Sequence, residues 1–80
     1  MKIDPDSLKM TCTSCPSQWD AKTTDGTYVY IRYRWGCLTV TARAFTEDEV
    51  ELLDWCGPSP WDGGMSTSEL SDILIKEGLM

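Results

Sequence analysis

Apolar and polar residues alternate from Tyr28 to Arg43, and this alternation predicts a β-hairpin. A two-residue turn at Trp35-Gly36 pairs Tyr33 with Leu38, Ile31 with Val40 and Val29 with Ala42. These six residues are apolar or aromatic, so they form one buried face, and a slip of one residue would mix the two faces. The opposite face then carries Tyr28, Tyr30, Arg32, Arg34, Cys37, Thr39, Thr41 and Arg43.

A further strand is predicted before this hairpin, because Asp25-Gly26 is a strong turn signal. A two-residue loop would expose Trp19, whereas a three-residue loop over 24–26 pairs Trp19 with Ile31 and Ala21 with Val29. Burying an indole is worth a few kcal/mol more than burying a lysine stem. We therefore expect a three-stranded antiparallel meander over 17–23, 27–34 and 37–43.

Two capping boxes follow the meander. The second, from Ser66 to Glu69, begins a C-terminal helix that ends at Gly78 and turns Leu70, Ile73 and Leu74 inward. The first, from Thr46 to Glu49, predicts a short helix over 47–55, although 50–55 could instead be a fourth strand. The Gly- and Pro-rich stretch from Cys56 to Gly64 is expected to be a loop, and residues 1–11 a loose arm.

The expected fold class is therefore α+β, a single small domain over residues 1–80. The C-terminal helix should lie across the sheet face formed by Trp19, Val29, Ile31 and Val40. The chain has no apolar run near the roughly 20 residues of a membrane span. Its first residues lack the apolar core of a signal peptide, so we expect a cytoplasmic protein without membrane contact.

The net charge of −6 is unevenly distributed along the chain. Residues 1–45 hold six basic and four acidic residues, whereas residues 46–80 hold one basic and nine acidic residues. An acidic chain does not usually bind nucleic acid. The acidic residues Glu47, Asp48, Glu51 and Asp54 are one candidate binding surface, although such a charge run can also simply keep a domain soluble.

The second candidate surface is the polar face of the hairpin, where aromatic and basic residues are interleaved: Tyr28, Tyr30, Arg32, Arg34 and Arg43. Exposed sheets of this composition bind single-stranded nucleic acid in some proteins. The same residues can also form a cross-strand ladder without a ligand. With a net charge of −6, we favour a protein partner, because Tyr, Trp and Arg are common at interface hot spots.

The four cysteines leave three interpretations open. In a reducing compartment they are more readily free thiols or metal ligands than disulfides. Four thiolates could hold zinc, and the candidate ligands are Cys12, Cys15, Cys37 and Cys56. The first three would lie near one end of the sheet, and Cys56 would join them from the following segment. Their spacing is not that of a standard zinc ribbon, so we expect unrelated thiols and no metal or other cofactor.

Catalytic motifs are absent from the sequence. It contains no histidine, so the usual general base at neutral pH is missing. There is also no phosphate-binding glycine loop. We therefore expect a protein that is not an enzyme.

Several short motifs resemble small uncharacterised proteins of phages, prophages and some bacteria. They are Cys15-Pro-x-Gln-Trp19, the Asp25-Gly26 turn, Tyr30-x-Arg-Tyr-Arg-Trp-Gly36 and Asp62-Gly-x-Met-Ser-Thr-x-Glu-Leu70. The resemblance covers about residues 15–75 and implies a mobile-element origin. By analogy with small acidic phage proteins, it implies binding to a host protein of unknown identity. The expected function is therefore non-enzymatic protein binding; the alternative is a zinc-stabilised module of nucleic-acid or transcription machinery.

Overall fold

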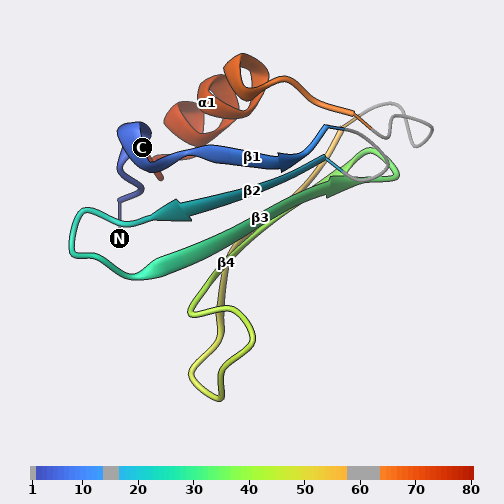
Figure 1. The fold of residues 1–80 in the computed structure, drawn as a ribbon. Helices are drawn as coiled ribbons and strands as arrows, with labels where there is room; N and C mark the ends of the chain where they lie inside the picture. Colours follow the sequence, from blue (N-terminus) through green and yellow to red (C-terminus); the bar gives the residue numbers. More distant parts are fainter. Residues whose placement is uncertain (1, 14–16, 58–63) are drawn as a thin grey trace.

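The computed structural model describes residues 2–13, 17–57 and 64–80, which form an antiparallel sheet with one α-helix on one face (Figure 1). Five strands lie side by side in chain order. They are β1 (Lys9–Cys12), β2 (Ser17–Lys22), β3 (Tyr28–Arg34), β4 (Cys37–Ala42) and β5 (Val50–Cys56), and the helix is α1 (Thr67–Lys76). The predicted α+β class is confirmed, with one strand added on each side of the expected meander.

The predicted register of the three central strands is confirmed. Trp19 lies opposite Ile31, and Ile31 lies opposite Val40. Both turns of the meander are of the expected length: Trp35 and Gly36 have φ of 55° and 74°, and Gly26 has φ of 91° after the Thr24–Asp25 corner. Gly26 occupies the left-handed position that favours glycine in a three-residue hairpin loop.

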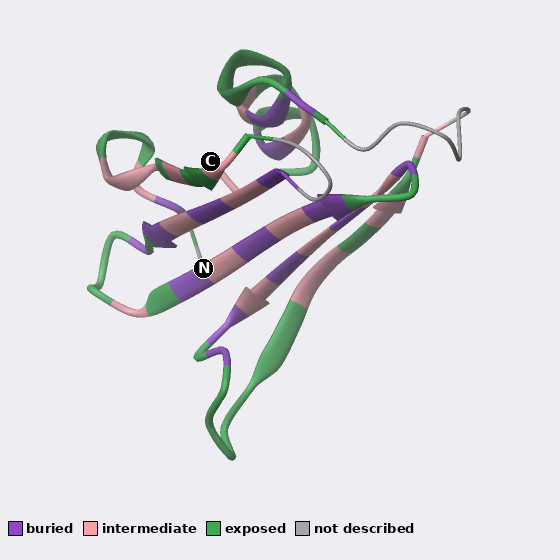
Figure 2. Cartoon of the chain, turned by 45° about the vertical axis from the view of Figure 1, so that its right-hand side comes forward, coloured by how far each residue is buried: buried purple, intermediate pink, exposed green. Residues whose placement is uncertain are grey.

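The hydrophobic core lies on the face of the sheet that α1 covers, and Ile3 and Met65 also contribute to it. Buried and partly exposed residues alternate along β2, β3 and β4, as the stripes in Figure 2 show. The core residues on the strands are Trp19, Ala21, Val29, Ile31, Tyr33, Leu38, Val40 and Ala42. Leu70 and Leu74 of α1 are fully buried against them, whereas Ile73 is partly buried at the margin.

The start of α1 is tied to strand β2 by side-chain hydrogen bonds. The indole Nε1 of Trp19 donates to Oγ1 of Thr67 at 3.0 Å, and the backbone N–H of Met65 donates to Oγ of Ser17 at 2.9 Å. Ser66 caps the helix by accepting from the N–H of Glu69 at 3.1 Å, as the capping box predicts. The helix is only ten residues long, so this docking stabilises a segment that would be marginal alone.

The prediction of a loose arm at residues 1–11 is wrong for the described residues of that segment. Ile3 is buried in the core, and its N–H donates to the carbonyl oxygen of Leu79 at 2.7 Å. After a 3₁₀ turn at Pro5–Ser7, the chain enters β1 and pairs with β2. Burial of Ile3 together with the pairing of β1 supplies the free energy that orders this segment, and neither shows as a periodic pattern.

The prediction of a helix at 47–55 is also wrong, because the chain takes the alternative, a strand. Strand β5 pairs with β4, and Leu53 and Trp55 pack against the core margin. The residues of the capping box do form local bonds: Oγ1 of Thr46 accepts from Asp48 N–H at 3.3 Å, and Oε1 of Glu49 accepts from Phe45 N–H at 3.4 Å. The box therefore stabilises the β4–β5 turn instead of a helix. The loop predicted at 56–64 lies mostly outside the described residues.

No helix in the described ranges has the length and apolar character needed to cross a bilayer.

The sheet register makes a stability prediction about its two faces. Ile31 is fully buried at the centre of β3, so Ile31→Ala should lower the free energy of unfolding by about 2–5 kcal/mol. Thr39 lies on the other face, and Thr39→Ala should cost under about 1 kcal/mol. Urea melts of the two variants measure both values, and equal losses would contradict the assigned faces.

Candidate binding face

The sheet has a second face, opposite α1, and no described element covers it. We call it the open face and define it by the outward residues of the strands. They are Lys9, Gln18, Asp20, Lys22, Tyr28, Tyr30, Arg32, Arg34, Cys37, Thr39, Thr41, Glu51, Asp54 and Cys56. Cross-strand pairing arranges them in rows, one of which runs Gln18, Arg32, Thr39, Asp54.

Next to the β3–β4 turn, the open face holds a pocket of about 300 Å³ that is lined by Arg32, Arg34, Trp35, Cys37 and Thr39. We call it the arginine pocket. Neither guanidinium group makes an ion pair within the described residues, and Nε of Arg32 is buried there without a hydrogen-bond partner. The guanidinium carbon of Arg34 lies 5.4 Å from the centre of the Trp35 ring, which is a cation–π contact.

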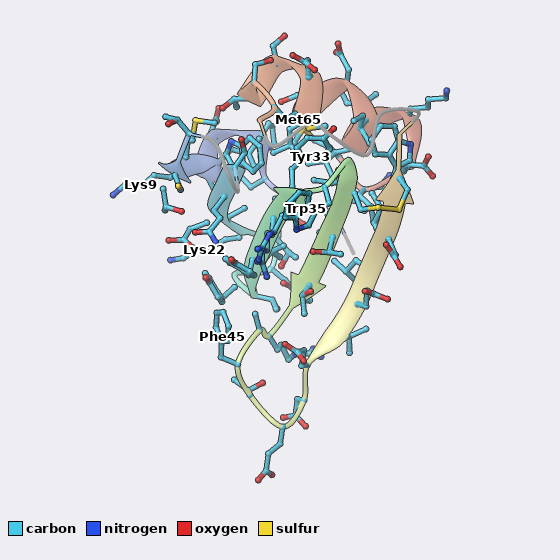
Figure 3. All side chains as sticks on the ribbon, turned by 90° about the vertical axis from the view of Figure 1, so that its right-hand side faces the viewer. Lys9, Lys22, Tyr33, Trp35, Phe45 and Met65 are labelled. Carbon is cyan, nitrogen blue, oxygen red and sulfur yellow. A yellow bond between two sulfur atoms is a disulfide. The ribbon has the colours of Figure 1, made fainter. Side chains whose placement is uncertain are left out.

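Two aromatic residues project from turns at the border of the open face. Trp35, in the β3–β4 turn, is 62% exposed, and Phe45, in the β4–β5 turn, is 78% exposed. Figure 3 shows both on the side away from the helix, whereas Tyr33 and Met65 lie next to it. The Phe45 ring also contacts Tyr30, with ring centres 5.2 Å apart.

Both exposed aromatic residues have left-handed backbone conformations. The φ of Trp35 is 55° and that of Phe45 is 67°; the third such non-glycine residue among those described is Arg43, with φ of 54°. This conformation costs an L-residue roughly 1–2 kcal/mol, and Asn or Gly is the usual choice. Strain of this kind is concentrated at functional sites, which marks the border of the open face as a candidate site.

At the other end of β3, Tyr28 is held by a neighbouring strand. Its hydroxyl donates to Oδ1 of Asp20 at 2.7 Å. Burial, followed by this bond to Asp20, raises the pKa of Tyr28 to about 12. Tyr28 and Asp20 also line a second pocket of about 440 Å³ with Ser7, Lys9, Ala21 and Lys22.

The structure brings the two predicted surfaces together on one side of the molecule. Glu51 and Asp54 lie on the open face of β5, opposite Thr41 and Thr39 of β4. Glu47 and Asp48 lie in the exposed segment that leads into β5, and Arg43 lies just after β4. The basic strand β3 and the acidic strand β5 are therefore separated only by the neutral threonines of β4.

The cysteines differ from the expectation of four thiols. Cys37 and Cys56 lie directly opposite each other on β4 and β5 and form a disulfide (Figure 3). Cys12 lies on β1, three strand spacings or about 14 Å from β4. Cys15 lies outside the described residues. The four-cysteine zinc set is thus incompatible with this arrangement, and the described residues contain no other group of potential metal ligands.

The sequence reasoning missed Trp35, Phe45 and Thr39 as residues of the site. Trp35 was assigned only as a turn residue, although a two-residue hairpin turn favours Asn or Gly at that position. The presence of a bulky indole there was the available signal. Phe45 gave no such signal, since its conformation depends on the turn between β4 and β5.

Neither a protein-family model nor a curated protein nor a solved structure matches this chain.

The disulfide makes a prediction about stability. The bond closes a loop with a sequence separation of 19 residues, so its loss should lower the free energy of unfolding by about 3 kcal/mol. Cys56→Ser in urea melts measures the effect, with wild type in reducing buffer as the second arm. Wild type in oxidising buffer is the reference. Equal melts of the variant and of wild type in both buffers would contradict a structural role for the bond.

The left-handed conformation of Trp35 predicts that a substitution at this position can raise the stability of the fold. Trp35→Asn creates Asn-Gly, the preferred two-residue hairpin turn. Relief of the backbone strain outweighs the loss of the Arg34 contact, so the free energy of unfolding should rise by up to about 1 kcal/mol. Thermal and urea melts provide the measurement. A loss of more than about 1 kcal/mol would show that the indole is needed for folding.

Proposed function

We propose that this chain is a non-enzymatic protein-binding domain that contacts its partner through the open face of the sheet. One observation carries the proposal: Trp35 and Phe45 are held in solvent by strained backbone, at the border of a face whose arginines make no described ion pair. Exposed aromatic residues and arginine are the residue types that dominate binding energy at protein interfaces. Residues that lower stability without filling the core are best explained by such a role.

A protein partner is favoured over nucleic acid by the acidic residues of the same face. Glu51 and Asp54 lie one strand away from the arginine pocket. A phosphate backbone that followed the basic strand would run beside these carboxylates and be repelled by them. A folded protein can instead present basic groups to β5 and acidic groups to β3.

The two charged parts of the face then have different roles. The acidic residues Glu47, Asp48, Glu51 and Asp54 are exposed at its edge and mainly affect how fast a partner is encountered. The arginine pocket and its aromatic border supply most of the affinity. The resemblance to phage and prophage proteins supports a host protein as the partner, which this domain would modulate by occupying its surface.

The proposal predicts that the open face, and not the helix side, determines binding. Trp35→Ala and Phe45→Ala should each reduce capture of the partner from host lysate by about tenfold, as is typical of hot-spot residues. Ile75→Ala on α1 is the matched control, because Ile75 is an exposed apolar residue, 59% exposed, on the other layer. Quantitative mass spectrometry of captured proteins, with circular dichroism to confirm folding, is the measurement.

A second arm of the same experiment separates rate from affinity. Reversal of Glu47, Asp48 and Glu51 to Lys should slow association and change its salt dependence, with a smaller effect on dissociation. If capture fails with Ile75→Ala but survives both open-face substitutions, the proposed surface is wrong.

A further inference from the structure

The arginine pocket has the groups needed to recognise an anion. Two guanidinium groups line it from the same strand face, since Arg32 and Arg34 are two residues apart on β3. Thr39 lies directly opposite Arg32 on β4 and adds a hydroxyl group. That hydroxyl makes only a long hydrogen bond, 3.5 Å, to the carbonyl oxygen of Arg32, so it can turn to a ligand at little cost.

The donors of the pocket are not used by the described part of the protein itself. Arg32 is half-buried, and within the described residues its guanidinium group has no acceptor, its buried Nε included. A buried donor without an acceptor costs free energy, and a ligand oxygen that reaches the group after a small side-chain rotation would recover it. The contact of Arg34 with Trp35 restricts the second guanidinium but leaves its N–H groups available.

We propose that the arginine pocket binds a side-chain carboxylate of an acidic peptide segment in the partner. This inference rests on the proposed function and names the chemistry of the partner. The planar guanidinium groups of Arg32 and Arg34 bind carboxylate oxygens in a bidentate manner. The exposed face of the Trp35 ring packs against the methylene groups that carry the carboxylate.

The charge next to the pocket distinguishes a carboxylate from a phosphate. Asp54 lies opposite Thr39, immediately beyond the pocket wall, and Glu51 follows along β5. A phosphate group carries nearly two negative charges at pH 7, so these acids repel it about twice as strongly as a carboxylate. The volume of about 300 Å³ also fits one or two side chains better than a stacked nucleotide.

The test uses the full chain and small peptides of defined charge. The probe is the acetylated and amidated peptide Gly-Glu-Glu-Gly, with Gly-Gln-Gln-Gly as the neutral match. A phosphoserine peptide and a short thymidine oligonucleotide represent the other anions. Nuclear magnetic resonance follows the Trp35 indole N–H and the Nε–H groups of Arg32 and Arg34 during titration, and thermal melts confirm that each variant is folded.

We expect the Glu peptide to shift these signals and the Gln peptide not to do so. Arg32→Gln and Arg34→Gln should each weaken binding about tenfold, and Arg32→Lys should weaken it too, because lysine keeps the charge but lacks the fork. Lys76→Gln is the control, because Lys76 is an exposed basic residue of α1 on the other layer, and it should change binding less than about twofold. Added salt should also weaken the binding.

Equal binding of the Gln peptide, tighter binding of the phosphopeptide or oligonucleotide, or no effect of either glutamine substitution would overturn the inference. If the Glu peptide does not bind while Trp35→Ala and Phe45→Ala still reduce partner capture, the carboxylate assignment is wrong and the proposed function stands. If those substitutions leave capture unchanged as well, both proposals are wrong.

Discussion

The alternation of residues along β3 determines both sides of this molecule at once. Val29 and Ile31 point into the core. Because successive side chains of a strand point to opposite faces, Tyr30 and Arg32 must point to the open face. A slip of one residue would bury Arg32 and expose Ile31, at a cost of several kcal/mol. The hydrophobic core therefore fixes the backbone from which the residues of the open face project.

Local sequence patterns predicted the three central strands and the helix. The register of β2, β3 and β4 follows from alternation and turn length, and α1 follows from its capping box and apolar stripe. Strand β1 was missed, and β5 was predicted only as the alternative to a helix, because the stability of both strands comes from their neighbours. Strand β1 depends on the edge that β2 offers, and the box from Thr46 to Glu49 has the bonding capacity to cap either a helix or a turn. The adjacent free edge of β4 selects the turn.

The candidate site was predictable to the same extent. The alternation of residues predicted that Arg32 and Arg34 share one face of the sheet. The disulfide could be predicted only if residues 50–56 were a strand, because only then does Cys56 lie opposite Cys37. A helix over 47–55 removes that pairing and leaves four apparent thiols. Such disulfides persist mainly in oxidising compartments. The Cys37–Cys56 pair therefore does not support the expectation of reduced cysteines in the cytoplasm.

The position of β5 also changes how the net charge is understood. Along the chain, the acidic second part looks like a separate surface, and the overall charge of −6 suggests uniform repulsion of anions. In the sheet, Asp54 and Arg32 occupy the same cross-strand row with Thr39 between them. Two strand spacings, about 10 Å, separate the two backbones, which is close to the screening length of about 8 Å in physiological salt. The face therefore carries opposite charges on neighbouring parts of one surface. Such a dipole would orient a partner of complementary charge before contact, which a uniformly acidic surface would not do.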